Sequence, residues 1–85
     1  MQLDERTMRL IAVGASITAN CQSCLQANFA KALGSGCDEQ EIAEAIWVGK
    51  MVRRGAATKM DSFATGLNQL VPLTANPSEE GCECK

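Results

Sequence analysis

The segment DEQEIAEAIWVGKMVRRGAA, residues 38–57, is the most regular stretch of the chain and predicts a helix. Asp38 and Glu41 match a capping box, in which each side chain bonds the backbone N–H of the other residue at a helix start. Apolar residues then recur at helical spacing on one face, namely Ile42, Ala45, Ile46, Gly49 and Val52. This face predicts packing against the rest of the chain.

The helical periodicity continues past Gly55 to about Leu70, through Ala56, Met60, Phe63, Ala64 and Leu67. Because glycine weakens a helix, we expect either one long bent helix or two helices that meet near Gly55. Pro72 ends the regular structure, since proline disfavours the helical conformation at the residue before it.

Two shorter helices are predicted upstream. Asp4 has the side chain of a cap for the first, which should run to about Thr18 or Ala19. Small residues at positions 14–16 would let another helix approach this one closely. We expect Asn20 to cap the second helix and Gly34-Ser35-Gly36 to end it. Its core-facing side chains should be Leu25, Phe29 and Leu33.

Cys21 and Cys24 fall in the first turn of this second helix, three residues apart. The unpaired N–H groups of a helix start stabilise a thiolate, and one turn brings the second thiol alongside the first. The pair can therefore open and close as a redox couple. Two other interpretations remain: half of a metal site, or two inert small residues.

The chain length predicts one small domain, and helical periodicity without an alternating strand pattern predicts that it is all-α. We place this domain at residues 1–71 and a cysteine-containing tail at residues 72–85. Of the 85 residues, 46% are hydrophobic but only 4% aromatic, which favours close packing of helices through small side chains. A core of this size usually needs a staple, a metal or an oligomer. Met51 and Met60 would fill core gaps, Trp47 would anchor packing or an interface, and Cys37 would be partly buried.

A net charge of −2 argues against nucleic-acid binding, and the basic cluster Lys50, Arg53, Arg54 and Lys59 is interpreted as a solvated or subunit-facing surface. No apolar run approaches the ~20 residues that cross a bilayer, so we expect no membrane partner and a cytoplasmic location. Thiols stay reduced in the cytoplasm, where cysteines are more often catalytic or metal-binding than structural.

Cys82 and Cys84 in the tail allow three interpretations. They can lack a function, or they can form a strained disulfide that relays reducing equivalents to the Cys21/Cys24 pair. They can also join that pair in a four-thiolate zinc or iron–sulfur site.

The motif DxxEIAEAI at residues 38–46 and KMVRRGAA at residues 50–57, following Cys21-x-x-Cys24, resemble the carboxymuconolactone decarboxylase-like family and its alkylhydroperoxidase D-like branch. The resemblance covers about Leu3 to Leu67. It implies an all-α fold that forms trimers or hexamers, with the cysteine pair as a redox-active disulfide near a subunit interface. In that branch the pair supports peroxide reduction or electron transfer to a partner peroxidase.

The sequence departs from that branch where the resemblance implies a proton relay. Asn28 stands at the position of a histidine and Arg9 at that of a glutamate, and the chain has no histidine. Neither residue exchanges protons near neutral pH. We therefore expect a thiol–disulfide oxidoreductase without a bound cofactor or metal. Its partner would be a redox protein, and its substrate a small disulfide or a hydroperoxide.

Within the Cys21/Cys24 pair we expect Cys21 to be the more exposed, attacking thiol and Cys24 to be the resolving thiol. Arg9 could stabilise the thiolate by its charge, and Asn28 could donate a hydrogen bond to sulfur. The competing interpretation is a non-catalytic or metal-binding scaffold that keeps the fold without the chemistry.

Overall fold

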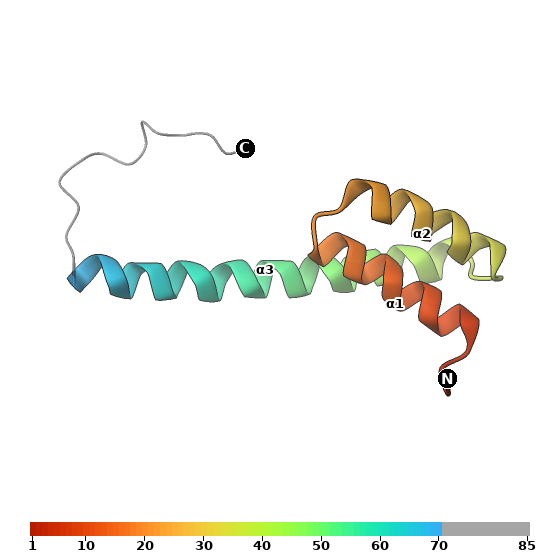
Figure 1. Cartoon of the computed structure of the whole chain (residues 1–85), viewed down its shortest axis with the longest axis horizontal. Coiled ribbons are helices and arrows are strands. Elements are labelled where there is room, and N and C mark those ends of the chain that lie inside the picture. The colour runs from red at the N-terminus through yellow and green to blue at the C-terminus, as the bar shows by residue number, and fades with distance from the viewer. Residues whose placement is uncertain (71–85) are drawn as a thin grey trace.

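The computed structural model describes residues 1–70, which form three α-helices and, within that range, no strand (Figure 1). Helix α1 spans Glu5–Thr18, α2 spans Gln22–Gly34 and α3 spans Glu39–Leu70. The predicted all-α fold is thereby confirmed. The predicted boundary at residue 71, the tail over residues 72–85, and its Cys82 and Cys84 lie outside the described residues.

Two of the predicted helix starts are confirmed by their hydrogen bonds. The Asp4 carboxylate accepts from the Thr7 N–H at 2.8 Å and caps α1. At α3, the Asp38 N–H donates to the Glu41 carboxylate at 3.1 Å, and the Glu41 N–H donates to the Asp38 carboxylate at 2.8 Å. Both caps satisfy N–H groups that have no partner inside their helix.

Glu41 also joins α3 to α1, because its carboxylate accepts a hydrogen bond from Arg6 and forms a salt bridge with it. That hydrogen bond holds the pKa of Glu41 below its usual range, and the Asp38 N–H acts in the same direction. The pKa of Arg6 is raised in turn. Both side chains are partly exposed, so water screens this pair.

This lowered pKa predicts loss of stability in acid. The folded state binds fewer protons than the unfolded chain between the two pKa values of Glu41, so stability falls as the pH drops through that range. We expect a thermal midpoint that declines below about pH 4.3. Glu41→Gln should lower the midpoint at neutral pH and shallow the acid decline. Glu44→Gln is the matched control, since within residues 1–70 Glu44 accepts only from Gln40. Identical curves for both variants would contradict the prediction.

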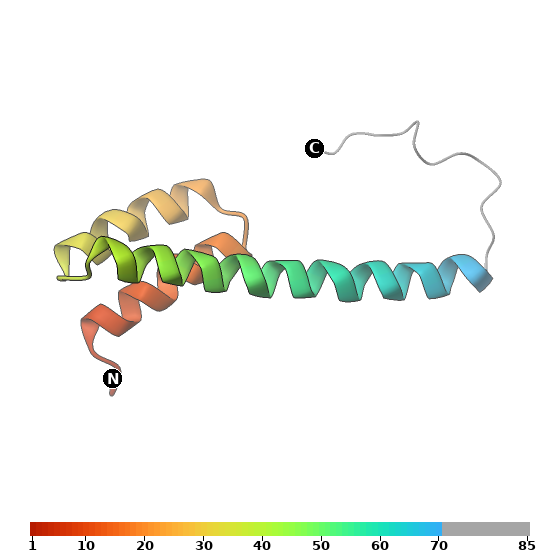
Figure 2. The ribbon, with the colours of Figure 1, turned by 180° about the vertical axis from the view of Figure 1, so that it is seen from behind.

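Helix α1 packs against both other helices, whereas α2 and α3 touch each other little (Figures 1 and 2). The core that results is small. Its buried members are Val13, Ala32, Cys37 and Ile42, with Leu10, Leu25, Ala45 and Ile46 packed around them. The predicted burial of Cys37 is confirmed, and its thiol donates to the Arg6 carbonyl at 3.6 Å.

Helices α1 and α3 cross at two glycines. A Cβ atom on Gly49 would overlap the Gly14 carbonyl oxygen and lie 2.9 Å from the Cβ of Ile17. The Thr18 hydroxyl donates to the Gly49 carbonyl at 3.1 Å across the same crossing. The predicted close approach at residues 14–16 is therefore confirmed, with α3 as the partner.

Helix α3 runs through Gly55 without a break, so no second helix begins there (Figure 2). Its C-terminal half projects beyond α1 and α2, and every residue from 54 to 70 is exposed. Within residues 1–70, no helix combines the length and apolarity needed to cross a membrane.

Several residues predicted to lie in the core are exposed in the single chain. These are Phe29, Leu33, Met51 and Met60. Trp47, predicted to anchor packing or an interface, is 62% exposed in the single chain, and its place in an interface stays a prediction. The physical reason is the apolar surface area that the helices present. Three helices of which one projects alone have more apolar faces than their shared core can cover.

Candidate functional site

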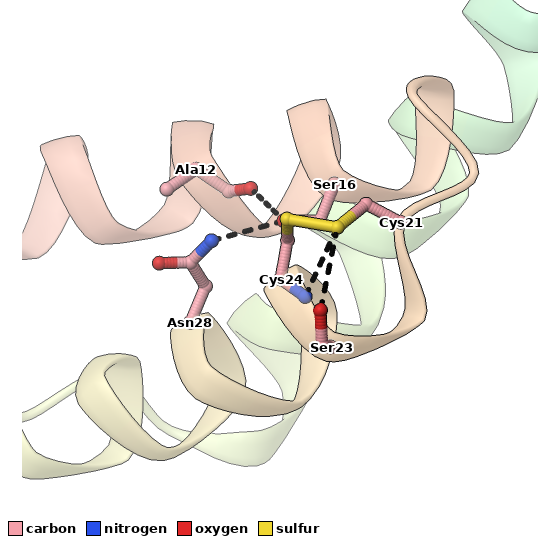
Figure 3. Close-up of a disulfide and its surroundings, with 6 residues drawn as sticks. All are labelled: Ala12, Ser16, Cys21, Ser23, Cys24 and Asn28. Carbon is pink, nitrogen blue, oxygen red and sulfur yellow. Dashed lines mark hydrogen bonds between the residues drawn. A yellow bond between two sulfur atoms is a disulfide. The ribbon is translucent and has the colours of Figure 1, made fainter.

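Cys21 and Cys24 form a disulfide at the N-terminus of α2 (Figure 3). Cys21 is the N-cap itself, and its sulfur accepts from the Cys24 backbone N–H at 3.2 Å. The Ser23 hydroxyl lies 3.7 Å from the same sulfur. The predicted pairing at a helix start agrees with this geometry. The predicted cap, Asn20, is wrong by one residue.

Asn20 does not cap α2 because its backbone has φ of 57°, in the left-handed region that asparagine tolerates better than most residues. Arg53 of α3 holds this turn. Its Nη1 donates to the Asn20 side-chain oxygen at 2.8 Å and to the Ile17 carbonyl at 3.2 Å. One arginine thus ties the end of α1 and the turn before Cys21 to α3.

The prediction that Cys21 is the more exposed of the two cysteines is wrong. In the single chain, Cys24 is exposed and Cys21 half-buried, so Cys21 is not the more exposed residue. As the cap, Cys21 lies in the turn between α1 and α2, whereas Cys24 sits on the open first turn of α2. The assignment of Cys21 as the attacking thiol stays a prediction, and it now rests on the hydrogen bond to its sulfur.

Asn28 does not donate to sulfur. Its Nδ2 donates to the Ser16 hydroxyl at 2.9 Å, and that hydroxyl donates to the Ala12 carbonyl at 2.8 Å. Two dashed lines in Figure 3 mark these bonds; the Ser16 oxygen, where both end, lies behind the disulfide in this view. Ser16 is only 5% exposed, so the bond from Asn28 satisfies a buried oxygen. The role of Asn28 is to join α2 to α1 beside the disulfide.

Arg9 also departs from its predicted role. Its guanidinium pairs with Glu5 at 3.1 Å, one turn toward the N-terminus of α1 and away from the turn that carries Cys21. No hydrogen bond joins Arg9 to either cysteine within residues 1–70. An acidic residue at the preceding turn thus directs Arg9 away from the disulfide.

A hollow of about 170 Å³ adjoins Cys21, lined by Ser16, Ile17, Asn20, Cys21, Gln22, Leu25 and Arg53. Sequence reasoning placed Arg53 on a solvated or subunit-facing surface and missed its contact with the disulfide turn. A signal was present. Arg53 continues the spacing of the buried face formed by Ile42, Ile46 and Gly49, where a charged residue is unexpected.

Residues 1–70 contain no group of three His, Cys, Asp or Glu side chains that could hold a metal ion. The predicted four-thiolate alternative also needs Cys82 and Cys84, which lie outside that range. What the described part presents is a disulfide at a helix N-terminus and an arginine that lines the same hollow as Cys21.

The comparisons with known proteins agree with this architecture. The model of the carboxymuconolactone decarboxylase family matches residues 2–65. A protein of Paracoccus denitrificans, described as uncharacterized protein 4 in the cox locus, is 40% identical over 55 residues, which are 65% of this chain and 50% of that protein. The chain thus spans about half the length of that relative. No solved structure matches significantly. Because the family model covers most of the chain, the protein belongs to the carboxymuconolactone decarboxylase family.

Proposed function

We propose that this chain is a thiol–disulfide oxidoreductase whose redox couple is Cys21 and Cys24. The observation that carries the proposal is the closed disulfide at the cap of α2, with a backbone N–H donating to the Cys21 sulfur. That N–H and the helix dipole remain after reduction, and both stabilise a thiolate. A stabilised thiolate beside a second thiol is what disulfide exchange requires.

The reaction we propose has two exchange steps. The Cys21 thiolate attacks a substrate disulfide, so that one substrate S–S bond breaks, a mixed disulfide forms and one substrate thiolate leaves. The Cys24 thiolate then attacks the Cys21 sulfur, which re-forms the protein disulfide and releases the second substrate thiol. Two electrons pass to the substrate, and a dithiol reductant restores the pair. Reduced dithiols of this kind are maintained in the cytoplasm, where we place the activity.

Hydroperoxide reduction is a weaker candidate, since it requires a proton for the leaving oxygen. Asn28 donates a hydrogen bond to Ser16, and Arg9 forms a salt bridge with Glu5. Neither Asn28 nor Arg9 can release and regain a proton near neutral pH. Thiol exchange needs no such relay, because thiolates are themselves adequate leaving groups. The site therefore favours disulfides over peroxides.

We also propose that the active form is a homo-oligomer, a trimer or hexamer, built on the projecting half of α3. Its exposed apolar residues follow an alternating spacing of four and three, as helices that pair in coiled coils do: Ala56, Met60, Phe63, Leu67 and Leu70. A second copy of the same helix has the matching spacing. Sedimentation equilibrium should give three or six times the chain mass of 9.1 kDa, and Phe63→Glu should reduce that mass. The mass of a single chain for the wild type would contradict the proposal.

The function is tested on protein purified without oxygen. Elemental analysis is performed first, because one zinc or an iron–sulfur cluster per chain held by Cys21 and Cys24 would replace the redox proposal with the metal-binding alternative. On metal-free protein, alkylation and peptide mass spectrometry in defined dithiol buffers should show the Cys21–Cys24 disulfide opening and closing reversibly. A pair that stays closed under all physiological dithiol ratios would refute the proposal.

A further inference from the structure

Arg53 is a half-buried arginine that borders the same hollow as Cys21. Its only hydrogen bonds within residues 1–70 run from Nη1 to two neutral oxygens, the Ile17 carbonyl and the Asn20 side chain. In that same range, the carboxylates that form salt bridges pair with Arg6 and Arg9 instead. Arg53 is therefore a fixed cation without a carboxylate partner in the described part of the chain.

The guanidinium has donors to spare. Arginine carries five N–H groups, and the two contacts made by Nη1 leave those of Nε and Nη2 without an acceptor among residues 1–70. The planar group suits a carboxylate, which it can bind through two parallel hydrogen bonds. Partial burial strengthens such a bond, because less water screens the charges.

The hollow limits what can bind there. A volume of about 170 Å³ is below the ~300 Å³ at which ordinary ligand pockets begin, so it accepts a short arm of a substrate and not a large molecule. The apolar part of its wall comes from Ile17 and Leu25, and Cys21 of the disulfide also lines it. A ligand whose carboxylate binds Arg53 would therefore occupy the hollow that Cys21 also lines.

From this arrangement we propose that the preferred substrates are small disulfides with a carboxylate a few bonds from the sulfur, and that Arg53 binds that carboxylate. The proposal rests on the proposed function and adds its substrate class. The exchange is the one balanced above: Cys21 attacks the substrate sulfur while the carboxylate stays on Arg53, and the leaving thiolate departs with the other half of the substrate.

The test uses pre-reduced full-length protein, freed of reductant, in single-turnover reactions with two disulfides. 3,3′-Dithiodipropionate carries carboxylates, and bis(2-hydroxyethyl) disulfide is neutral. Oxidation of the Cys21/Cys24 peptide is followed by acid quench, alkylation and mass spectrometry. The readout is the ratio of the rate constant for the charged disulfide to that for the neutral one. Arg53→Gln should lower this ratio about tenfold, as expected for loss of one charge-assisted contact.

Arg54→Gln is the matched control, because it removes the same charge from a neighbouring residue that lines a different hollow, with Met51 and Lys59. It should leave the ratio unchanged, and Arg53→Lys should retain part of it. A ratio that Arg53→Gln does not change, or that both glutamine variants lower equally, overturns the proposal. If Arg53→Gln does not fold, competition on the wild type decides: propionate should slow the reaction, and propionamide at equal ionic strength should not.

Failure of the proposed function would look different. In that case neither the wild type nor the Arg53 variants would oxidise the Cys21/Cys24 pair with the neutral disulfide. A wild type that reacts with the neutral disulfide but shows no preference for the carboxylate refutes only the assignment of Arg53.

Discussion

Gly49→Ala is expected to destabilise the protein by about 1–3 kcal/mol or more, which is the range for overpacking a tight interior site. The added Cβ would overlap the Gly14 carbonyl oxygen and press on Ile17. The obstacle is backbone, which cannot turn aside as a flexible side chain can. Helices α1 and α3 would have to separate, and the Thr18 hydrogen bond to the Gly49 carbonyl would lengthen. Denaturant unfolding of wild type and variant at equal protein concentration measures the loss.

The same chain supplies graded controls. At Gly14 a Cβ would lie 3.0 Å from the Ala45 carbonyl oxygen, so Gly14→Ala should cost less than Gly49→Ala. At Gly66 it would meet nothing within 4 Å on the exposed part of α3, and Gly66→Ala should stabilise the helix by about 0.5–1 kcal/mol. Equal effects at positions 49 and 66 would show that helix propensity, and not the crossing, governs both.

Much of the fold could be predicted from local rules. The caps at Asp4 and at Asp38 with Glu41 involve residues three apart, so their bonds depend only on local conformation. The glycine stop after α2 is local too, with Gly36 at φ of 93°. Burial could not be predicted in this way. Phe29 and Leu33 have the right spacing for a core face, but spacing does not say whether the covering surface belongs to the same chain.

The candidate site likewise combines features that local rules predict with contacts that they do not. A spacing of three residues at a helix start indicated that Cys21 and Cys24 could pair, but also allowed a metal site or two inert residues; the structure shows the disulfide. The roles of Asn28 and Arg9 depended on which neighbour each side chain bonds, and the structure gives Ser16 and Glu5 as their partners in place of sulfur. Arg53 acts on residues 33 and 36 positions away, a separation at which no local rule operates.

The pair itself gives the last prediction, which concerns the order of attack. Cys24→Ser should stop multiple turnover with a dithiol reductant and trap a mixed disulfide on Cys21, because the resolving thiol is missing. The backbone N–H of residue 24, which donates to the Cys21 sulfur, survives this change. Cys21→Ser should abolish turnover and trap little adduct, since the exposed Cys24 lies inside the helix and not at its cap. Peptide mass spectrometry after brief exposure to a small disulfide locates the adduct.

Cys37→Ser serves as the control. Cys37 is only 4% exposed, so its thiol should form no adduct, and its replacement should not change turnover. An adduct that forms faster on Cys24 in Cys21→Ser than on Cys21 in Cys24→Ser would assign attack to Cys24. Exposure would then outweigh thiolate stabilisation at the cap. A bond from Cys21 to Cys82 or Cys84 in the Cys24→Ser protein would show that the C-terminal thiols can resolve the intermediate, as the relay interpretation of those cysteines requires.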